Sequence, residues 1–138
     1  MCTLIKASKE TEVIGYKVVA KNTVTGKYYS FTMGFQYKSP MTFTKLEIQN
    51  RLTREISNRI LEEYANFGFA KDMVGRSACF RSLKDAEYLY MSYKDGLTYP
   101  QFKLVIVKVK MTNDLMSGTY CMSDVVAGRT MEILKEVK

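Results

Sequence analysis

The sequence contains no histidine and no tryptophan, and its 138 residues include only two prolines and three cysteines. Without histidine there is no imidazole to act as a general base near neutral pH or as a zinc ligand, so Ser–His and Cys–His nucleophile pairs are excluded. The cysteines, Cys2, Cys79 and Cys121, form no C-x-x-C spacing and cannot all pair with one another. We therefore expect reduced thiols that serve only in packing, and no metal site.

Long apolar runs are also lacking. Nowhere do about 18 uncharged apolar residues follow one another, so no membrane-spanning helix is predicted, and the charged segment 1–12 does not fit a secretion signal. The composition is otherwise that of a globular protein, 46% hydrophobic and 25% charged. We expect a soluble cytoplasmic protein with a single nucleotide-binding domain, residues 1–138, around one core.

Known catalytic motifs are missing as well. The chain has no glycine-rich P-loop, no dinucleotide fingerprint and no H-E-x-x-H helix. Glu62 and Glu63 are adjacent, so on a helix they point to different faces, and Asp114 and Asp124 can meet only through the fold. The sequence therefore predicts a binding protein, not an enzyme, and no cofactor.

The charge is strongly positive, with 21 basic and 14 acidic residues and a formal net charge of +7. Such a balance favours an anionic partner, such as a nucleotide, a nucleic acid or an anionic surface. The basic residues are spread along the chain and form no dense run. The same charge is therefore also typical of an ordinary solvated surface.

Apolar runs and alternation predict several β-strands. Residues 13–20 form an apolar run, residues 27–37 alternate strictly, and the turn-forming segment 22–26 between them predicts an antiparallel hairpin. Residues 102–110 are rich in Val and Ile on both faces, which predicts a central strand. Further strands are predicted at 76–80, 119–122 and 129–137.

Two helices are predicted as well. A capping box at 44–47 indicates the start of a helix that runs to about residue 65. Ser82 and Asp85 mark a second start, after which apolar residues recur at helical spacing up to Tyr93. The predicted fold class is α+β: a twisted antiparallel sheet with two main helices packed against it.

The segment 123–130, Ser-Asp-Val-Val-Ala-Gly-Arg-Thr, is the most informative for function. Its small residues Ala127 and Gly128 would let backbone N–H groups approach a ligand beside Arg129, so a loop here could hold a phosphate. Asp124 lies in the same segment and is included among the candidate ligand-binding residues. The alternative is a strand-to-strand turn with a glycine at positive φ and an arginine that pairs with a surface carboxylate.

Aromatic side chains are numerous, with ten tyrosines and seven phenylalanines. They can supply stacking surfaces for nucleobases, but most aromatic residues build cores. The alternating stripe from Tyr29 to Tyr37 is expected to be core. Phe102 is the candidate for stacking, because it is the first residue of its predicted strand and the ends of strands often border clefts.

Short motifs follow one another along most of the chain outside 82–100. They are Tyr-Lys-Val-Val at 16–19, the aromatic segment 29–37, Met-Val-Gly-Arg at 73–76, Asp-Leu-Met-Ser-Gly-Thr at 114–119, Val-Ala-Gly-Arg at 126–129 and Ile-Leu-Lys-Glu-Val at 133–137. In this order they resemble a group of small phage-encoded proteins, the Thoeris anti-defence sponge family.

The resemblance implies a function. Members of that family sequester a cyclic ADP-ribose isomer made by bacterial TIR-domain enzymes and leave it intact, and some also hold cyclic trinucleotides. They act in the host-cell cytoplasm as oligomers with shared pockets, which implies a homo-oligomer, dimer or higher, and a small cyclic nucleotide as ligand. By the same resemblance Arg129 binds the pyrophosphate, Phe102 stacks on adenine and Asn113 adds a polar contact.

Two other functions remain open from the sequence. One is a protein-binding phage inhibitor of a bacterial defence system, comparable to an anti-CRISPR protein, which would use surface charge and aromatic residues against a large partner. The other is a small nucleic-acid-binding module, whose affinity would fall steeply with salt. We expect neither a membrane nor a nucleic acid as the partner.

Overall fold

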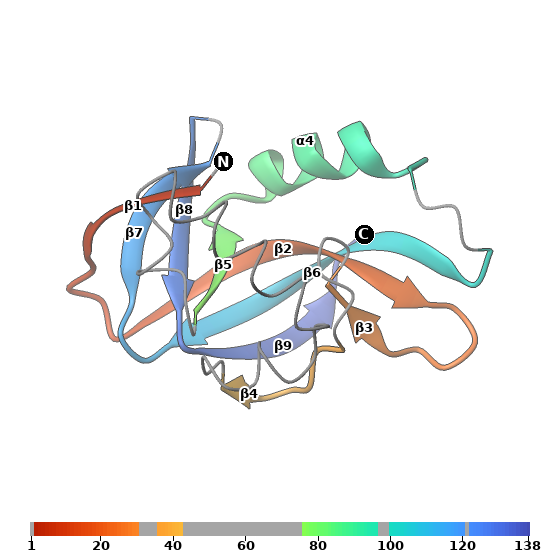
Figure 1. Ribbon diagram of the computed structural model, residues 1–138, viewed down its shortest axis with the longest axis horizontal. Coiled ribbons are helices and arrows are strands. Elements are labelled where there is room, and N and C mark those ends of the chain that lie inside the picture. Colours follow the sequence, from red (N-terminus) through yellow and green to blue (C-terminus); the bar gives the residue numbers. More distant parts are fainter. Residues whose placement is uncertain (1, 31–35, 43–75, 97–99, 121) are drawn as a thin grey trace, which may run out of the picture.

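The computed structural model describes residues 2–30, 36–42, 76–96, 100–120 and 122–138. The described strands form one antiparallel sheet in the order β1-β7-β8-β5-β2-β6-β9-β4, with β3 beside β2 (Figure 1). Their bounds are β1 Cys2–Ala7, β2 Glu12–Asn22, β3 Tyr28–Tyr29, β4 Met41–Thr42, β5 Ser77–Phe80, β6 Phe102–Thr112, β7 Met116–Tyr120, β8 Ser123–Gly128 and β9 Thr130–Glu136. The described helix, α4, spans Leu83–Tyr93.

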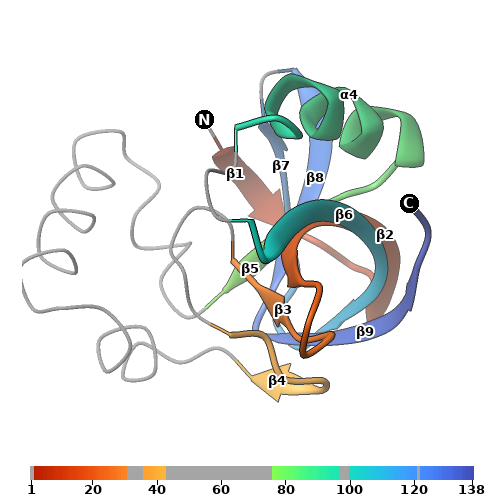
Figure 2. The same cartoon turned by 90° about the vertical axis from the view of Figure 1, so that its right-hand side faces the viewer.

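The centre of the sheet is the pair of eleven-residue strands β2 and β6. They are paired over their full length, from Glu12 opposite Thr112 to Asn22 opposite Phe102. Because β6 lies between β2 and β9, the predicted central position of the Val- and Ile-rich strand is confirmed. Figure 2 shows that β2, β6 and β9 curve strongly, so the sheet has an inner and an outer face.

Apolar residues of β6 alternate between two core clusters. Val105, Val107 and Val109 belong to the cluster on the inner face. Leu104 and Ile106 belong to the second cluster, which lies under α4 and includes its buried residue Ala86. From Leu104 to Val107 both faces of the strand are therefore removed from water, which is why the sequence is apolar there, whereas from Val107 to Met111 buried apolar residues alternate with lysines.

The predicted hairpin is confirmed. The side chain of Asn22 accepts hydrogen bonds from the backbone N–H groups of Val24 and Thr25, at 2.9 and 3.1 Å, and Gly26 has a φ of 75°. Strand β3 then pairs antiparallel with β2, although it is only two residues long. Of the predicted strand 27–37, residues 31–35 lie outside the described part, and Tyr37 is buried in the inner core.

The predicted arrangement with two main helices against the sheet is wrong. The described residues are mostly β-structure, with nine strands and one helix of 11 residues. The physical reason is that 2–7, 116–120 and 123–128 are also strands, so the curved sheet buries much of its inner face itself. The helix predicted from 44–47 to about residue 65 lies outside the described residues.

Helix α4 begins where the sequence predicts. The hydroxyl of Ser82 accepts a hydrogen bond from the backbone N–H of Asp85 at 3.2 Å, which satisfies one of the orphan donors of the first turn. Figure 1 shows the helix lying across one face of the sheet, over β2 and β6. No helix in the described ranges is long and apolar enough to cross a membrane.

Cys79 is a packing residue of the inner core, with 2% of its surface exposed. Burial raises the pKa of its thiol to about 12, so the reactive thiolate is not formed near neutral pH. This environment agrees with the role in packing that was expected for the thiols. The side chains of Cys2 and Cys121 lie outside the described part of the chain.

Gly15 allows β2 and β5 to approach closely. A Cβ at this position would lie 2.5 Å from the Cys79 sulfur and 2.5 Å from the carbonyl oxygen of Phe80. A backbone oxygen cannot move aside as a flexible side chain can. We predict that Gly15→Ala lowers the free energy of unfolding by about 2–3 kcal/mol, through overpacking, as measured by chemical denaturation.

The matched control is Glu12→Ala on the same strand. Glu12 is exposed, and a surface substitution of this kind changes stability by no more than about 0.5 kcal/mol. Equal stability of wild type and Gly15→Ala would show that β2 and β5 are not held this close.

Candidate functional site

The turn between β6 and β7 positions the candidate site. Asn113 and Asp114 have φ values of 65° and 53°, in the left-handed region that Asn and Asp tolerate better than most residues. The carbonyl of Asn113 accepts a hydrogen bond from the backbone N–H of Arg129 at 3.0 Å. The turn is therefore tied to the junction between β8 and β9.

Asp114 accepts hydrogen bonds from two arginine side chains that come from other parts of the chain. Its Oδ2 accepts hydrogen bonds from Arg76 Nη2 at 2.6 Å and from Arg129 Nε at 2.9 Å, and its carbonyl accepts a further one from Arg76 Nε at 3.1 Å. The hydrogen bond from Arg129, followed by the charge of Arg76, holds the pKa of the Asp114 carboxyl below its ordinary value. Two guanidinium groups thus contact one carboxylate, which holds both of them at the same end of the sheet.

Neighbouring polar side chains extend this arrangement. The amide of Asn113 donates to Thr130 Oγ1 at 2.7 Å, and that hydroxyl lies 3.2 Å from the hydroxyl of Thr42. We call the group formed by Arg76, Asn113, Asp114, Arg129 and Thr130 the Asp114 corner. It joins residues from before β5, from the β6–β7 turn and from the β8–β9 junction.

The small residues before Arg129 serve packing. The segment Ser123–Gly128 is strand β8 and not a loop, and Ala127 is fully buried between β5 and β7. A Cβ on Gly128 would lie 2.7 Å from Leu115 and 2.9 Å from the carbonyl oxygen of Thr112. Gly128 therefore leaves room for the β6–β7 turn of the same chain. Neither Ala127 nor Gly128 leaves its backbone accessible to a ligand.

The remaining predicted residues lie elsewhere. Asp124 is exposed near the start of β8, and its carbonyl accepts from the backbone N–H of Arg81. Phe102 opens β6, at the opposite end from Thr112, on the order of 30 Å away along an extended strand. Its ring makes an edge contact with Tyr29 at 5.4 Å. One chain thus brings Asn113 together with Arg129, but brings neither Asp124 nor Phe102 to them.

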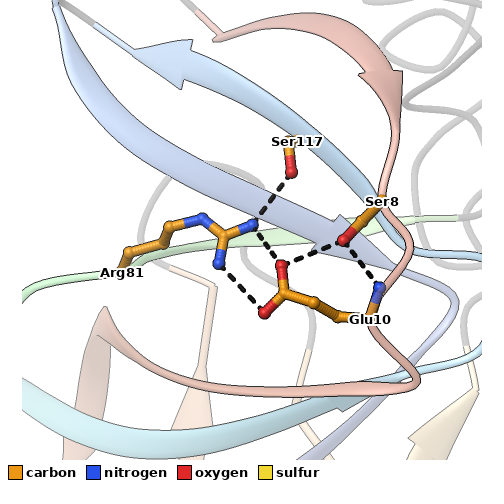
Figure 3. A network of polar contacts seen from close by, with 4 residues as sticks. All are labelled: Ser8, Glu10, Arg81 and Ser117. Carbon is orange, nitrogen blue, oxygen red and sulfur yellow. Dashed lines mark hydrogen bonds and ion pairs between the residues drawn. The ribbon is translucent and has the colours of Figure 1, made fainter.

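Arg81 provides a comparison, because both terminal nitrogens of its guanidinium donate hydrogen bonds (Figure 3). Its terminal nitrogens donate to the two carboxylate oxygens of Glu10 at 2.9 and 3.4 Å, and one of them also donates to Ser117 at 2.9 Å. Ser8 in turn donates to Glu10 at 3.0 Å. This network fastens the β1–β2 connection to β7 and to the segment before α4, which is a structural role.

Arg129 differs from Arg81 in which nitrogens of its guanidinium group remain available to a ligand. Its side chain is 42% exposed, and it is held to Asp114 through Nε. Its two terminal nitrogens donate no hydrogen bond to any of the described residues. The side chain of Arg76, by contrast, is only 7% exposed. Arg129 is therefore the arginine of the corner that can reach a ligand from solvent.

Sequence reasoning named Arg129 and Asn113 as candidate site residues, and it did not predict that Asp114 and Arg76 lie beside them. Asn113 and Asp114 follow a strong strand, which is a turn signal. The partners of Asp114, however, lie 38 and 15 positions away along the chain. Local patterns carry no information on contacts at such separations.

Comparisons of the chain with protein-family models, with curated proteins and with solved structures found no match.

The distribution of charged residues along the chain also bears on the Asp114 corner. The described ranges contain sixteen Lys and Arg residues and nine Asp and Glu residues, so the whole excess of seven positive charges lies in them. The Asp114 corner thus belongs to a strongly basic part of the chain.

Asp114 should make stability depend on pH in the acidic range. Because its folded-state pKa is below the ordinary value of 3.8, its contribution is present above that value and is lost as the pH falls through the lowered pKa. We predict that Asp114→Asn is less stable than wild type at neutral pH and that the two converge at low pH. Denaturation midpoints measured across the acidic range check this.

Asparagine tolerates the left-handed backbone, so this substitution changes the charge without straining the turn. The control is Asp124→Asn, which removes an exposed carboxylate that makes no ion pair with the described residues. A constant difference between wild type and Asp114→Asn at every pH would contradict the prediction.

Proposed function

We propose that the protein is a non-enzymatic binding protein that sequesters a small phosphate-bearing nucleotide of the cyclic ADP-ribose type in the host-cell cytoplasm. The observation that carries the proposal is the half-exposed guanidinium of Arg129, held through Nε by Asp114 with its terminal nitrogens open. Those two nitrogens are the pair that makes parallel hydrogen bonds to a phosphate.

Preorganisation supports this proposal. An arginine on a flexible surface loses side-chain entropy when it binds a ligand, whereas Arg129 is already held by Asp114. The buried side chain of Arg76 shares the same carboxylate and so helps to hold Asp114 in place beside Arg129. A pyrophosphate held by such charge-assisted contacts requires no nucleophile and no general base, so sequestration fits the missing catalytic motifs.

The location of Phe102 leads to the second part of the proposal. Within one chain this residue lies at the far end of β6 from the Asp114 corner. A pocket that contains both Arg129 and Phe102 therefore needs two copies of the chain, one supplying the phosphate contact and the other the stacking surface. We include such a homo-oligomer in the proposed function.

Arg129→Ala should weaken binding of a cyclic ADP-ribose isomer about tenfold or more, because a charge-assisted contact is worth about 1.5–3 kcal/mol. The melting temperature should change little, because Asp114 keeps Arg76 as a partner. Arg129→Lys should restore only part of the affinity, since an ammonium group lacks the planar fork. Calorimetric titration measures the affinities.

Lys84→Ala is the control that removes one exposed positive charge in the first turn of α4. Affinity equal to wild type in Arg129→Ala would overturn the proposed role of the corner. The released ligand should have an unchanged mass after the protein is heated, as read by mass spectrometry. A hydrolysed product would contradict sequestration.

A mixing experiment tests the shared pocket. Phe102→Ala should lose about 1–3 kcal/mol of stacking energy, so each single variant should bind the nucleotide weakly. If Phe102 of one copy and Arg129 of another border the same ligand, mixed oligomers of Phe102→Ala and Arg129→Ala chains contain intact pockets. We expect unfolding and refolding the two together to restore up to about a quarter of the sites, as random pairing of chains dictates. No restored binding would contradict a pocket between copies.

A further inference from the structure

The outer face of the sheet continues beyond the cover of α4. Leu104 and Ile106 are buried beneath the helix, and the next residues of β6 on the same face are Lys108 and Lys110. The register places Lys108 between Tyr16 on β2 and Lys135 on β9. It places Lys110 between Ile14 and Glu132. We call the group of Ile14, Tyr16, Lys108, Lys110 and Lys135 the lysine face.

Lys108 and Lys135 are direct cross-strand neighbours of like charge. Such a pair is destabilising by itself, and neither ammonium group has an ion-pair partner among the described residues. Glu132 is paired with Lys110, at 3.3 Å, so it does not offset the repulsion. Glu12, on the same face, lies opposite Thr112 at the end of the ladder and pairs with none of the lysines.

Protection of a sheet edge does not explain Lys108 and Lys110. Charged residues on edge strands prevent pairing with other chains. Lys108 and Lys110, however, lie on β6, which has β2 on one side and β9 on the other. An interior strand has no free edge, so the two positive charges on its outer face have no such use.

Exposed aliphatic surface accompanies the charge. Ile14 is 41% exposed beside Lys110, and Leu134, next to Lys135 in the chain, is 42% exposed. Tyr16 is partly buried and packs against the cluster under α4. The lysine face therefore offers ammonium groups and aliphatic side chains to a partner, and little aromatic surface on which a base can stack.

We propose that the lysine face docks an acidic polypeptide segment that presents both carboxylates and aliphatic side chains toward the sheet. The carboxylates contact Lys108 and Lys135 and remove their mutual repulsion, and the aliphatic side chains cover Ile14 and Leu134. Charge complementarity sets the partner's sign, and the exposed aliphatic carbon favours a polypeptide over a nucleic acid. This site is separate in its residues from the Asp114 corner.

A short fluorescent peptide of repeated Glu-Glu-Val-Val is the probe, because in an extended chain this repeat places glutamate and valine on the same side. Binding is followed by anisotropy at low ionic strength. Wild type should bind it, and should bind a glutamate–serine peptide more weakly and a lysine–valine peptide not at all. Lys135→Glu should weaken binding tenfold or more. The same variant should melt at an equal or higher temperature than wild type, because the like-charged pair becomes an opposite one.

Lys27→Glu is the matched control, since it makes the same change of charge in the β2–β3 hairpin and should alter peptide binding less than twofold. Arg129→Ala should also bind the peptide as wild type does, so this proposal and the proposed nucleotide site fail independently. The proposal is overturned if wild type does not bind the glutamate–valine peptide or if Lys135→Glu binds it equally. Tighter binding of single-stranded DNA than of the peptide would overturn it too.

Discussion

The rest of the structure depends on the pairing of β2 with β6. The two strands pair without interruption over eleven positions, and β6 carries buried side chains on both faces. A shift of register by one residue would move every buried side chain to the wrong face, so the hydrophobic effect fixes the ladder. Fixing the ladder also fixes its ends. Phe102 therefore stays beside the β2–β3 hairpin, and the turn at Asn113 stays beside the β8–β9 junction.

The Asp114 corner follows from that constraint. Arg76 precedes β5 and Arg129 follows β8, and these two strands pair with each other, so both arginines emerge at the same end of the ladder. Two guanidinium groups this close repel each other unless an anion lies between them. Asp114 supplies a negative charge between them, which keeps the two groups together. The guanidinium of Arg129 is thereby preorganised, which lowers the cost of binding an anionic ligand.

Whether an element could be predicted from the sequence depends on how far apart along the chain its interacting residues lie. The hairpin around Asn22 and the helix start at Ser82 were predictable, because a side chain there binds backbone two or three residues away. The strands 2–7, 116–120 and 123–128 were not predicted as such, because Ser, Gly and Thr give them a weak pattern and their pairing depends on neighbouring strands. Gly128 was interpreted as a residue that admits a ligand, and it admits the chain's own backbone instead. Both uses demand a small side chain, so composition cannot tell them apart.

The lysine face and the Asp114 corner are separate in their contacts but not in their electric fields. Lys110 lies only two positions before Thr112, where the ladder ends and the turn of the corner begins. At physiological salt the charges are screened over about 8 Å, so the lysines would add to the positive potential near Arg129 chiefly at low ionic strength. Long-range charge of this kind raises the association rate, whereas a contact such as that of Arg129 chiefly slows dissociation. Salt should therefore reduce the association rate at the corner even where no lysine touches the ligand. Equilibrium affinities alone would merge the two contributions, and only the separate rates would identify which charges contact the proposed ligand and which attract it.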